Sequence, residues 1–321
     1  MTKTKVLVSR LLPPRVMSEA QQRFQLTQRQ IPAPMKQDEA IRSLETFDAI
    51  IPTLGDDFSS QTFNQVDNLQ CRILANFGAG YNHIDIAAAQ KRGIVVSNTP
   101  GAVTDATADI TLALILMTAR RTAEGDRLVR ADQWTGWHPT QMLGTQVSGQ
   151  TLGIIGMGNI GKAIALRCQA GFGMKVVFFN RSLVSNPGVI AEQLNSAEDV
   201  ANRADFVVIA VRGGASSYHL VSEKLLGAMR SDAILINISR GDVVDEKALI
   251  KALKAKQIAG AGLDVYEFEP KVPKELKTMD NVVLLPHLGT SVLKVREEMG
   301  MMALDNLSAF FATGKPPNQV V

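Results

Sequence analysis

Three ionisable side chains in the second half of the chain each follow a short apolar run. Arg240 comes after the run ILINIS, Glu269 lies just beyond LDV, and His287 follows VVLLP. If these runs are parallel strands, their carboxyl ends meet at one edge of a sheet, where ligands and reacting groups gather. We therefore expect the three side chains to converge.

These residue types suit the reduction of a ketone that neighbours a carboxylate. Hydride addition leaves an alkoxide that must receive a proton, and histidine is the residue type that most often supplies one, which makes His287 the candidate. A carboxylate such as Glu269 would orient the ring and favour its protonated form. Arg240 would bind the substrate carboxylate and polarise the carbonyl. Each residue alone has a plainer interpretation, as a strand-end cap, a surface charge or a core histidine, but the set of three downstream of a dinucleotide turn favours catalysis.

That turn is the segment LGIIGMGNIGKAIA at residues 152–165. Gly156 permits a tight turn, Gly158 lets the backbone approach a pyrophosphate, and Gly161 lets a helix pack closely on the strand. A helix that starts near Asn159 would direct free N–H groups and its positive dipole end at the phosphates. Because the flanking strand and helix are both readable, we interpret the motif as dinucleotide-binding rather than as a structural turn. The candidate contacts are Gly156, Met157, Gly158, Asn159, Ile160 and Gly161.

The end of the next strand distinguishes NAD from NADP. An acidic residue there would bond the ribose hydroxyls of NAD and repel a 2′-phosphate. The sequence has Asn180, Arg181 and Ser182 instead. These side chains can donate hydrogen bonds, and Arg181 can form a fork or stack on adenine, although it could also be only a solvated charge. We therefore expect NADP(H) in preference to NAD(H).

Short apolar runs alternate with helical patterns along the whole chain, which predicts parallel sheets. We expect a first series of strands at 5–9, 49–52, 73–76 and 94–97, and a second at 151–155, 175–179, 206–211, 234–238, 261–265 and 282–285. We expect helices at 38–46, 84–92, 104–121 and 293–311, and a loop at 131–149. The six strands of the second series fit a doubly wound sheet. The helix at 104–121 is apolar around much of its circumference, so it should be buried on several sides, between domains or against another subunit.

Length and composition narrow the classes of protein. A chain of 321 residues suggests two domains. Its 34 basic and 31 acidic residues give a net charge of +3, with no broad footprint for nucleic acid or membrane. Cys71 and Cys168 lie far apart in apolar segments, which predicts buried free thiols and no metal site. No signal-peptide core follows the N-terminus, and the apolar run at 110–119 is too short to span a bilayer, so we expect a soluble, cytoplasmic protein.

A more specific indication comes from motifs in a fixed order over nearly the whole chain. They are GAGYNHID at 78–85, NTPG at 98–101, TDATAD at 104–109, the glycine turn, NISRGDVVD at 237–245, GLDV at 262–265 with Glu269-Pro270, and PHLG at 286–289. With these motifs the chain resembles the D-isomer-specific 2-hydroxyacid dehydrogenases, and within them the glyoxylate/hydroxypyruvate reductase (D-glycerate dehydrogenase) branch.

The resemblance implies an α/β fold with two Rossmann-like doubly wound parallel-sheet domains. A discontinuous, flavodoxin-like substrate-binding domain would comprise 1–99 and 288–321, and an NADP-binding Rossmann domain 100–287. The protein would be a homodimer built largely through the cofactor domain.

The resemblance also implies roles for single residues. Arg240 would bind the substrate, His287 would contact it as the acid/base, Glu269 would be the partner of His287, and the backbone amides of Ala79 and Gly80 would hold the substrate carboxylate. Further cofactor contacts would lie at Thr104, Val211, Arg212, Ile238, Ser239, Asp264 and Gly289. Asp264 would bond the nicotinamide amide, and Arg212 would either assist a 2′-phosphate or only face solvent. His83, otherwise a rival acid inside a helix start, becomes a structural residue.

The expected activity is NADPH-dependent reduction of glyoxylate and hydroxypyruvate to glycolate and D-glycerate. A D-lactate-type or aromatic 2-oxo-acid reductase is the related alternative. Phosphoglycerate dehydrogenase is disfavoured because little chain follows the last helix, and formate oxidation because it needs no proton transfer from a His–Glu pair. A dinucleotide-sensing scaffold like the corepressors on this fold is the non-enzymatic alternative, and the lack of long disordered flanks argues against it.

Overall fold

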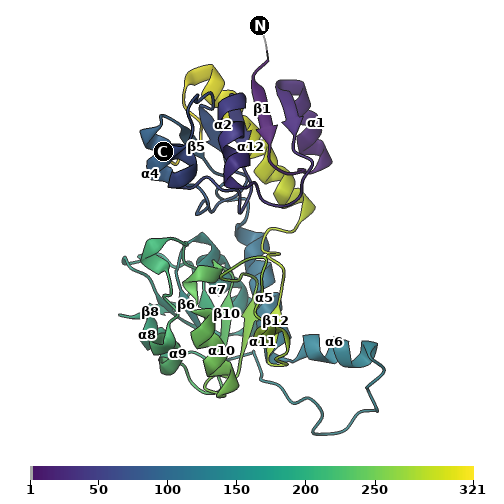
Figure 1. Ribbon diagram of the computed structural model, residues 1–321. Coiled ribbons are helices and arrows are strands. Elements are labelled where there is room, and N and C mark those ends of the chain that lie inside the picture. The colour runs from purple at the N-terminus through teal and green to yellow at the C-terminus, as the bar shows by residue number, and fades with distance from the viewer. Residues whose placement is uncertain (1–2) are drawn as a thin grey trace. The chain divides into compact units, whose positions relative to one another are not determined.

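Two parallel sheets organise the chain, one in each of two units (Figure 1). The structure is a computed structural model that describes residues 3–321. Unit 1 runs to Val103 and resumes at Ser291–Val321, and unit 2 is Thr104–Thr290. The domain boundaries expected from the sequence lie near these limits, while the assignment of substrate to one unit and cofactor to the other stays a prediction.

Unit 1 contains a five-stranded sheet in the order β2-β1-β3-β4-β5, the flavodoxin-like arrangement. Its strands are β1 (Lys5–Val8), β2 (Gln25–Gln28), β3 (Ala49–Ile51), β4 (Ile73–Ala75) and β5 (Val95–Ser97). Its helices are α1 (Pro14–Arg23), α2 (Gln37–Thr46), α3 (Ser60–Asn64), α4 (Ile86–Lys91) and α12 (Leu293–Thr313).

Alternation along the strands of unit 1 builds one apolar core on each face of the sheet. Val6 and Val8 contribute to the core that contains residues of α1 and α12, whereas Leu7 contributes to the core that contains residues of α2, α3 and α4. Because successive side chains of a strand point to opposite faces, a sheet covered on both sides needs continuous apolar runs. The C-terminal segment is also fixed, since the N–H of Val320 donates to the carbonyl of Val96 at 2.7 Å.

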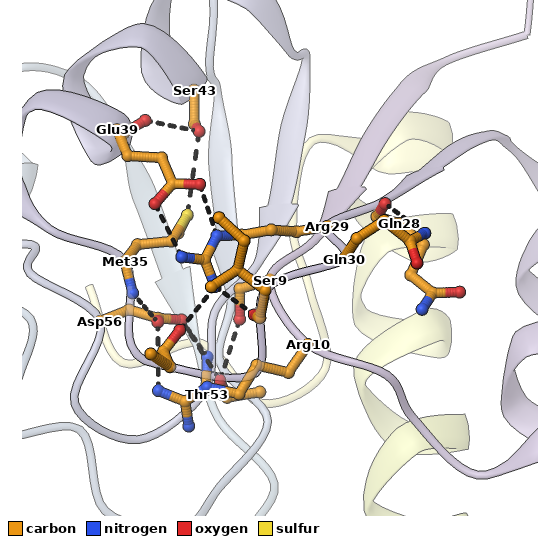
Figure 2. Close-up of polar contacts among 12 residues, drawn as sticks. Ser9, Arg10, Gln28, Arg29, Gln30, Met35, Glu39, Ser43, Thr53 and Asp56 are labelled. Carbon is orange, nitrogen blue, oxygen red and sulfur yellow. Dashed lines mark hydrogen bonds and ion pairs between the residues drawn. The ribbon is translucent and has the colours of Figure 1, made fainter.

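A buried polar cluster joins the loops at the carboxyl ends of β1 and β3 (Figure 2). The fully buried carboxylate of Asp56 accepts hydrogen bonds from the N–H groups of Met35 and Thr53, each at 2.8 Å, and lies 3.5 Å from Arg10 Nη2. Beside it, Arg29 forms a two-point ion pair with Glu39 at the start of α2. The cluster thereby holds the 29–36 loop against the end of the sheet.

Unit 2 contains a seven-stranded sheet in the order β12-β11-β10-β9-β6-β7-β8. Its strands are β6 (Thr151–Ile155), β7 (Lys175–Phe179), β8 (Ala191–Gln193), β9 (Phe206–Ile209), β10 (Ile234–Asn237), β11 (Gly260–Leu263) and β12 (Val282–Leu284). Its helices are α5 (Thr104–Ala119), α6 (Thr122–Arg130), α7 (Asn159–Phe172), α8 (Ala197–Arg203), α9 (Glu223–Ala228), α10 (Glu246–Lys254) and α11 (Lys274–Lys277), with 3₁₀ turns η1 (Ala215–Ser217) and η2 (Gly241–Val243). The α/β fold with two doubly wound parallel sheets is therefore confirmed.

Two short strands were missed in the sequence, one in each unit, and because β8 belongs to the second series the expected count of six strands there is wrong. β2 (Gln25–Gln28) and β8 (Ala191–Gln193) are both edge strands in which no residue is buried. An edge strand that packs little apolar surface has no apolar run from which to recognise it. The helix expected at 84–92 begins later, because Asp85 caps α4 and the first helical residue is Ile86. His83 therefore lies before the helix.

Helix α5 packs against α7 and against strands β10, β11 and β12 of its own unit. Leu114 and Ile115 are buried in that contact, but Leu112, Leu116 and Met117 are only half-buried. The following α6 has no buried residue, and α6 and the loop at 131–149 extend away from the sheet of unit 2 (Figure 1). Within residues 3–321, no helix is long and apolar enough to cross a bilayer.

Candidate active site

The carboxyl ends of the central strands of unit 2 form one row. The register pairs Ile155 with Ile209, Ile209 with Asn237, Asn237 with Leu263, and Leu263 with Leu284. Every residue that follows this row leaves the sheet at the same edge. The strand order reverses between β6 and β9, which is where a doubly wound sheet binds its ligand.

The structure brings His287 and Glu269 into contact at this edge. His287 Nδ1 lies 2.9 Å from Glu269 Oε2, and the N–H of Tyr266 donates to Glu269 Oε1 at 3.1 Å. A carboxylate acceptor selects the Nδ1–H form of the ring, which leaves Nε2 to exchange a proton with a substrate. His287 has a φ of 55°, a left-handed conformation that non-glycine residues adopt at a cost and that clusters at functional sites.

The pKa of Glu269 is subject to opposing effects. Burial acts to raise the pKa of Glu269, but the hydrogen bond and charge of His287, the Tyr266 amide and the charge of Arg240 together hold the pKa below its ordinary value. Glu269 is therefore a carboxylate at neutral pH, and its negative charge faces the ring that must carry the proton.

Arg240 lies after β10 as a largely unpaired cation. Its Nη1 donates to the carbonyl of Ser239 at 2.7 Å, whereas its buried Nε has no hydrogen-bond partner within residues 3–321. Burial lowers the pKa of Arg240, and the carboxylates of Glu269 and Asp242 act in the opposite direction. A half-buried guanidinium with a free Nε donor is suited to binding an anionic substrate group.

Asp264 organises the backbone that carries His287. The N–H of His287 donates to the Asp264 carbonyl, and the Asp264 carboxylate accepts from the N–H groups of Leu288 at 2.6 Å and Gly289 at 2.8 Å. Burial raises the pKa of this carboxyl group. Both carboxylate oxygens are thus engaged with the loop at 287–289, and a bond from Asp264 to a nicotinamide amide stays a prediction.

The glycine turn has the geometry that a pyrophosphate requires. Gly156 has a φ of 106°, and a Cβ there would lie 2.6 Å from the carbonyl oxygen of Ala210. A Cβ at Gly161 would lie 2.3 Å from the carbonyl oxygen of Gly156, so α7 can approach β6 only with glycine there. A Cβ at Gly158 would meet nothing within 4 Å, which leaves open space over the peptide at the start of α7. This cradle fits a dinucleotide pyrophosphate.

The remaining candidates of unit 2 lie at the same edge or at its flanks. Ile238 and Ser239 follow β10, Val211 and Arg212 follow β9, and Thr104 begins α5. Asn180, Arg181 and Ser182 follow β7, where Asn180 Nδ2 donates to Ser182 Oγ at 3.1 Å and Arg181 Nη1 donates to Ser216 Oγ at 3.0 Å. Arg181, Ser182 and Arg212 are exposed and can reach a ligand.

In unit 1, the loop after β4 presents backbone donors. The carbonyls of Gly78 and Gly80 accept from Asn76 Nδ2 at 2.9 and 3.1 Å, and the carbonyl of Ala79 accepts from Asn98 Nδ2 at 2.8 Å. The N–H groups of Ala79 and Gly80 have no partner in the described part of the chain. With its carbonyls fixed, the loop is suited to donating to an anion.

Several residues that shape the site escaped sequence reasoning. Asn237 donates from Nδ2 to the Arg240 carbonyl at 2.9 Å and accepts from Ser239, which fixes the turn that carries Arg240. Asn76 and Asn98 do the same for the Ala79–Gly80 loop. Asn237 and Asn98 are the first residues of two of the motifs and Asn76 lies just before a third, but only the fold identifies their partners.

Comparison with known proteins agrees with this geometry. Residues 112–289 match the model of the D-isomer specific 2-hydroxyacid dehydrogenase NAD-binding domain. The chain is 44% identical over 288 residues to a glyoxylate reductase of Pyrococcus horikoshii, a match that covers 87% of this chain and 84% of the relative.

Solved structures extend the likeness to the whole chain. A D-isomer specific 2-hydroxyacid dehydrogenase from Polaromonas has a TM-score of 0.91 at 32% identity, covering 99% of this chain and 100% of that one. An NADPH-dependent glyoxylate/hydroxypyruvate reductase from Sinorhizobium meliloti, solved with NADP and malonate, has a TM-score of 0.89 at 32% identity, covering 100% and 97%. Together with the motifs and the strand-end row, these matches establish that the chain belongs to the D-isomer specific 2-hydroxyacid dehydrogenase family, in its glyoxylate reductase branch.

Proposed function

We propose that this D-2-hydroxyacid dehydrogenase reduces glyoxylate to glycolate and hydroxypyruvate to D-glycerate, with NADPH in preference to NADH. The observation that carries the proposal is the unpaired, buried Nε of Arg240 beside the 2.9 Å His287–Glu269 pair, on the strand-end row that begins at the glycine turn. The glyoxylate reductases among its relatives support the substrate class.

A few residues of the chain each perform one part of the reaction. When bound, the nicotinamide supplies the hydride that reaches the carbonyl carbon. Arg240 binds the anionic substrate and polarises its carbonyl, and the amides of Ala79 and Gly80 hold the carboxylate. His287 delivers its proton from Nε2 to the forming alkoxide, while Glu269 holds the ring through Nδ1. Thr104 and the edge residues after β6, β9, β10 and β11 bind the cofactor.

The preference for NADPH rests on the end of β7. No carboxylate stands among Asn180, Arg181 and Ser182, so nothing there repels a 2′-phosphate of about −1.5 to −2 charges. The exposed Arg181 and Ser182, with Arg212 after β9, offer donors for it. The Sinorhizobium relative, described as NADPH-dependent, supports this assignment.

We propose that the protein is a homodimer built through unit 2. The half-buried Leu112, Leu116 and Met117 of α5 support this assembly, as do the exposed Trp134 and Trp137 on the loop after α6. Apolar surface of this kind is typical of a subunit interface. A cytoplasmic location stays a prediction from the sequence.

A panel of kcat/KM values tests the proposed function. Glyoxylate, hydroxypyruvate, pyruvate and phenylpyruvate are each assayed with NADPH and with NADH. We expect glyoxylate and hydroxypyruvate to exceed the other two acids, and NADPH to exceed NADH. Higher values for phenylpyruvate or pyruvate would favour the aromatic or D-lactate-type alternative. A pure protein that binds NADPH but turns over none of the four acids would contradict the enzyme and favour a sensing scaffold.

A further inference from the structure

Unit 2 contains a second histidine–carboxylate pair, whose carboxylate lies on the loop that carries Glu269. His219 Nε2 lies 2.9 Å from Glu267 Oε1, and the side chain of Glu267 is only 10% exposed. Neither residue has a part in the reaction described above. Because Glu267 is two residues before Glu269, this second pair acts on the same segment of backbone as the first.

Helix α10 holds Glu267 from the other side. The N–H of Glu267 donates to Glu246 Oε1 at 2.9 Å, and the N–H of Glu246 approaches Glu267 Oε2 at 3.5 Å. Glu246 is the first residue of α10 and is 5% exposed, and burial raises its pKa. Glu267 is therefore fixed through its backbone by Glu246 and through its side chain by His219.

His219 connects this loop to the turn that follows Arg240. Its N–H donates to the carbonyl of Asp242, in η2, at 2.9 Å. A Cβ at Gly241 would lie 1.8 Å from the carbonyl carbon and oxygen of Tyr266, so the two segments meet backbone against backbone. One histidine thus bonds both the segment after Arg240 and the segment before Glu269.

The orientation of Glu269 depends on that same backbone. The N–H of Tyr266 binds Glu269 Oε1, which leaves Oε2 directed to His287. A shift of the 266–267 backbone would move the amide that orients Glu269, and the carboxylate would lose its alignment with the ring. Catalytic geometry tolerates little displacement, since a 1 Å error can cost about 100-fold in rate.

We propose that His219 and Glu267 are positioning residues that fix the 266–269 loop against the 241–243 turn and so keep Glu269 aligned on His287. Neither is among the residues to which we assign contacts with substrate or cofactor. The inference rests on the proposed function, because it takes the His287–Glu269 pair as the source of the proton. An exposed ion pair with no such role would contribute little to activity or stability.

The first test compares His219→Ala with His219→Gln. Glutamine carries a side-chain donor of similar reach, whereas alanine carries none. We expect His219→Ala to lower kcat for glyoxylate reduction about 10-fold, within the loss that misalignment can cause, and to leave the KM for NADPH within about twofold. His219→Gln should recover most of kcat. The matched control is Glu223→Ala, which removes the exposed Lys251–Glu223 pair of the same unit and should leave kcat unchanged.

The second test is a double-mutant cycle with Glu269→Gln. If His219 acts through Glu269, adding His219→Ala to Glu269→Gln should lower kcat by less than about twofold, because the charged carboxylate that His219 helps to align is already absent. A full additional 10-fold loss would show an independent effect and overturn the positioning role. Glu267→Gln replaces His219→Ala in the cycle if the alanine variant does not fold.

The outcomes separate the two claims. An active wild type whose His219→Ala variant keeps its kcat overturns the positioning role alone. A wild type that binds NADPH but reduces no 2-oxo acid overturns the proposed function, and the positioning role with it.

Discussion

At the scale of single residues, the site separates binding from proton transfer. Arg240 is a half-buried cation whose buried Nε is free, which suits an anion, and His287 is a ring whose Nδ1 is already engaged by Glu269. The types of these residues and their places after apolar runs were sufficient to predict that they converge. Their hydrogen bonds were not predictable, because they depend on backbone groups such as the Tyr266 amide.

Replacing Glu269 tests the proton-transfer role. Glu269→Gln keeps the shape of the side chain but removes the negative charge 2.9 Å from the ring. We expect kcat/KM for glyoxylate to fall about 100-fold, because general acid catalysis loses its oriented, charged donor. The measurement is NADPH oxidation by the variant and by wild type, and a loss of less than about threefold would contradict the role of Glu269.

The Glu269→Gln variant should also differ from wild type in the pH dependence of kcat/KM. The pKa of Glu269 lies below its ordinary value of 4.5, so the wild-type carboxylate stays charged as the pH falls to that value, and its stabilising effect is lost only below it. Glutamine has no carboxylate to protonate, so Glu269→Gln has no such loss. The kcat/KM of wild type should therefore fall in an acidic step below pH 4.5 that is absent from the profile of Glu269→Gln. The same acidic step in both proteins would contradict this role of the carboxylate charge.

At the scale of elements, the strands with buried apolar runs could be predicted, and the two strands without a buried residue could not. β9 and β10 are buried along their whole length, and a short apolar run is their direct signature. β2 and β8 lie at the edges with no buried residue, so nothing in their composition separates them from loops. The Asp56 cluster was equally hidden, since it joins loops that are far apart in sequence.

The Asp56 cluster permits a stability prediction for unit 1. Asp56→Ala would leave the N–H groups of Met35 and Thr53 and the Arg10 cation without their buried acceptor. We expect the free energy of unfolding to fall by about 3 kcal/mol. Urea denaturation followed by circular dichroism measures it, with the exposed Asp67→Ala as the control. Equal midpoints for Asp56→Ala and the control would show that the cluster is not stabilising.

At the scale of the whole molecule, the order of motifs indicated the family, and the structure explains why the order matters. Residues separated by more than a hundred positions follow strand ends of the same row, as Gly156 after β6 and Asp264 after β11 do. The sequence could not place the asparagines that fix the turns, because an asparagine side chain has no preferred partner until the chain folds. Nor could the sequence show that α5 packs against α7 and against strands β10, β11 and β12 of its own unit.

If the protein is a homodimer, its mass in solution should be twice that of the chain. Light scattering on the wild type should give twice 34.7 kDa. Trp137→Ser with Leu143→Ser removes two exposed apolar side chains of the 131–149 loop and should shift the protein toward the monomer. Leu11→Ser, an equally exposed site in unit 1, should leave the mass unchanged. A monomeric wild type would refute the dimer.

The most direct test of the central claim is glyoxylate-dependent NADPH oxidation by Arg240→Ala beside wild type, with NADPH binding measured by fluorescence on both. We predict that wild type turns over and that the variant loses at least about 1,000-fold in kcat/KM, because its substrate loses a buried charged partner, while its affinity for NADPH is retained. An Arg240→Ala variant that still reduces glyoxylate at a rate near that of wild type would show that Arg240 does not bind the substrate.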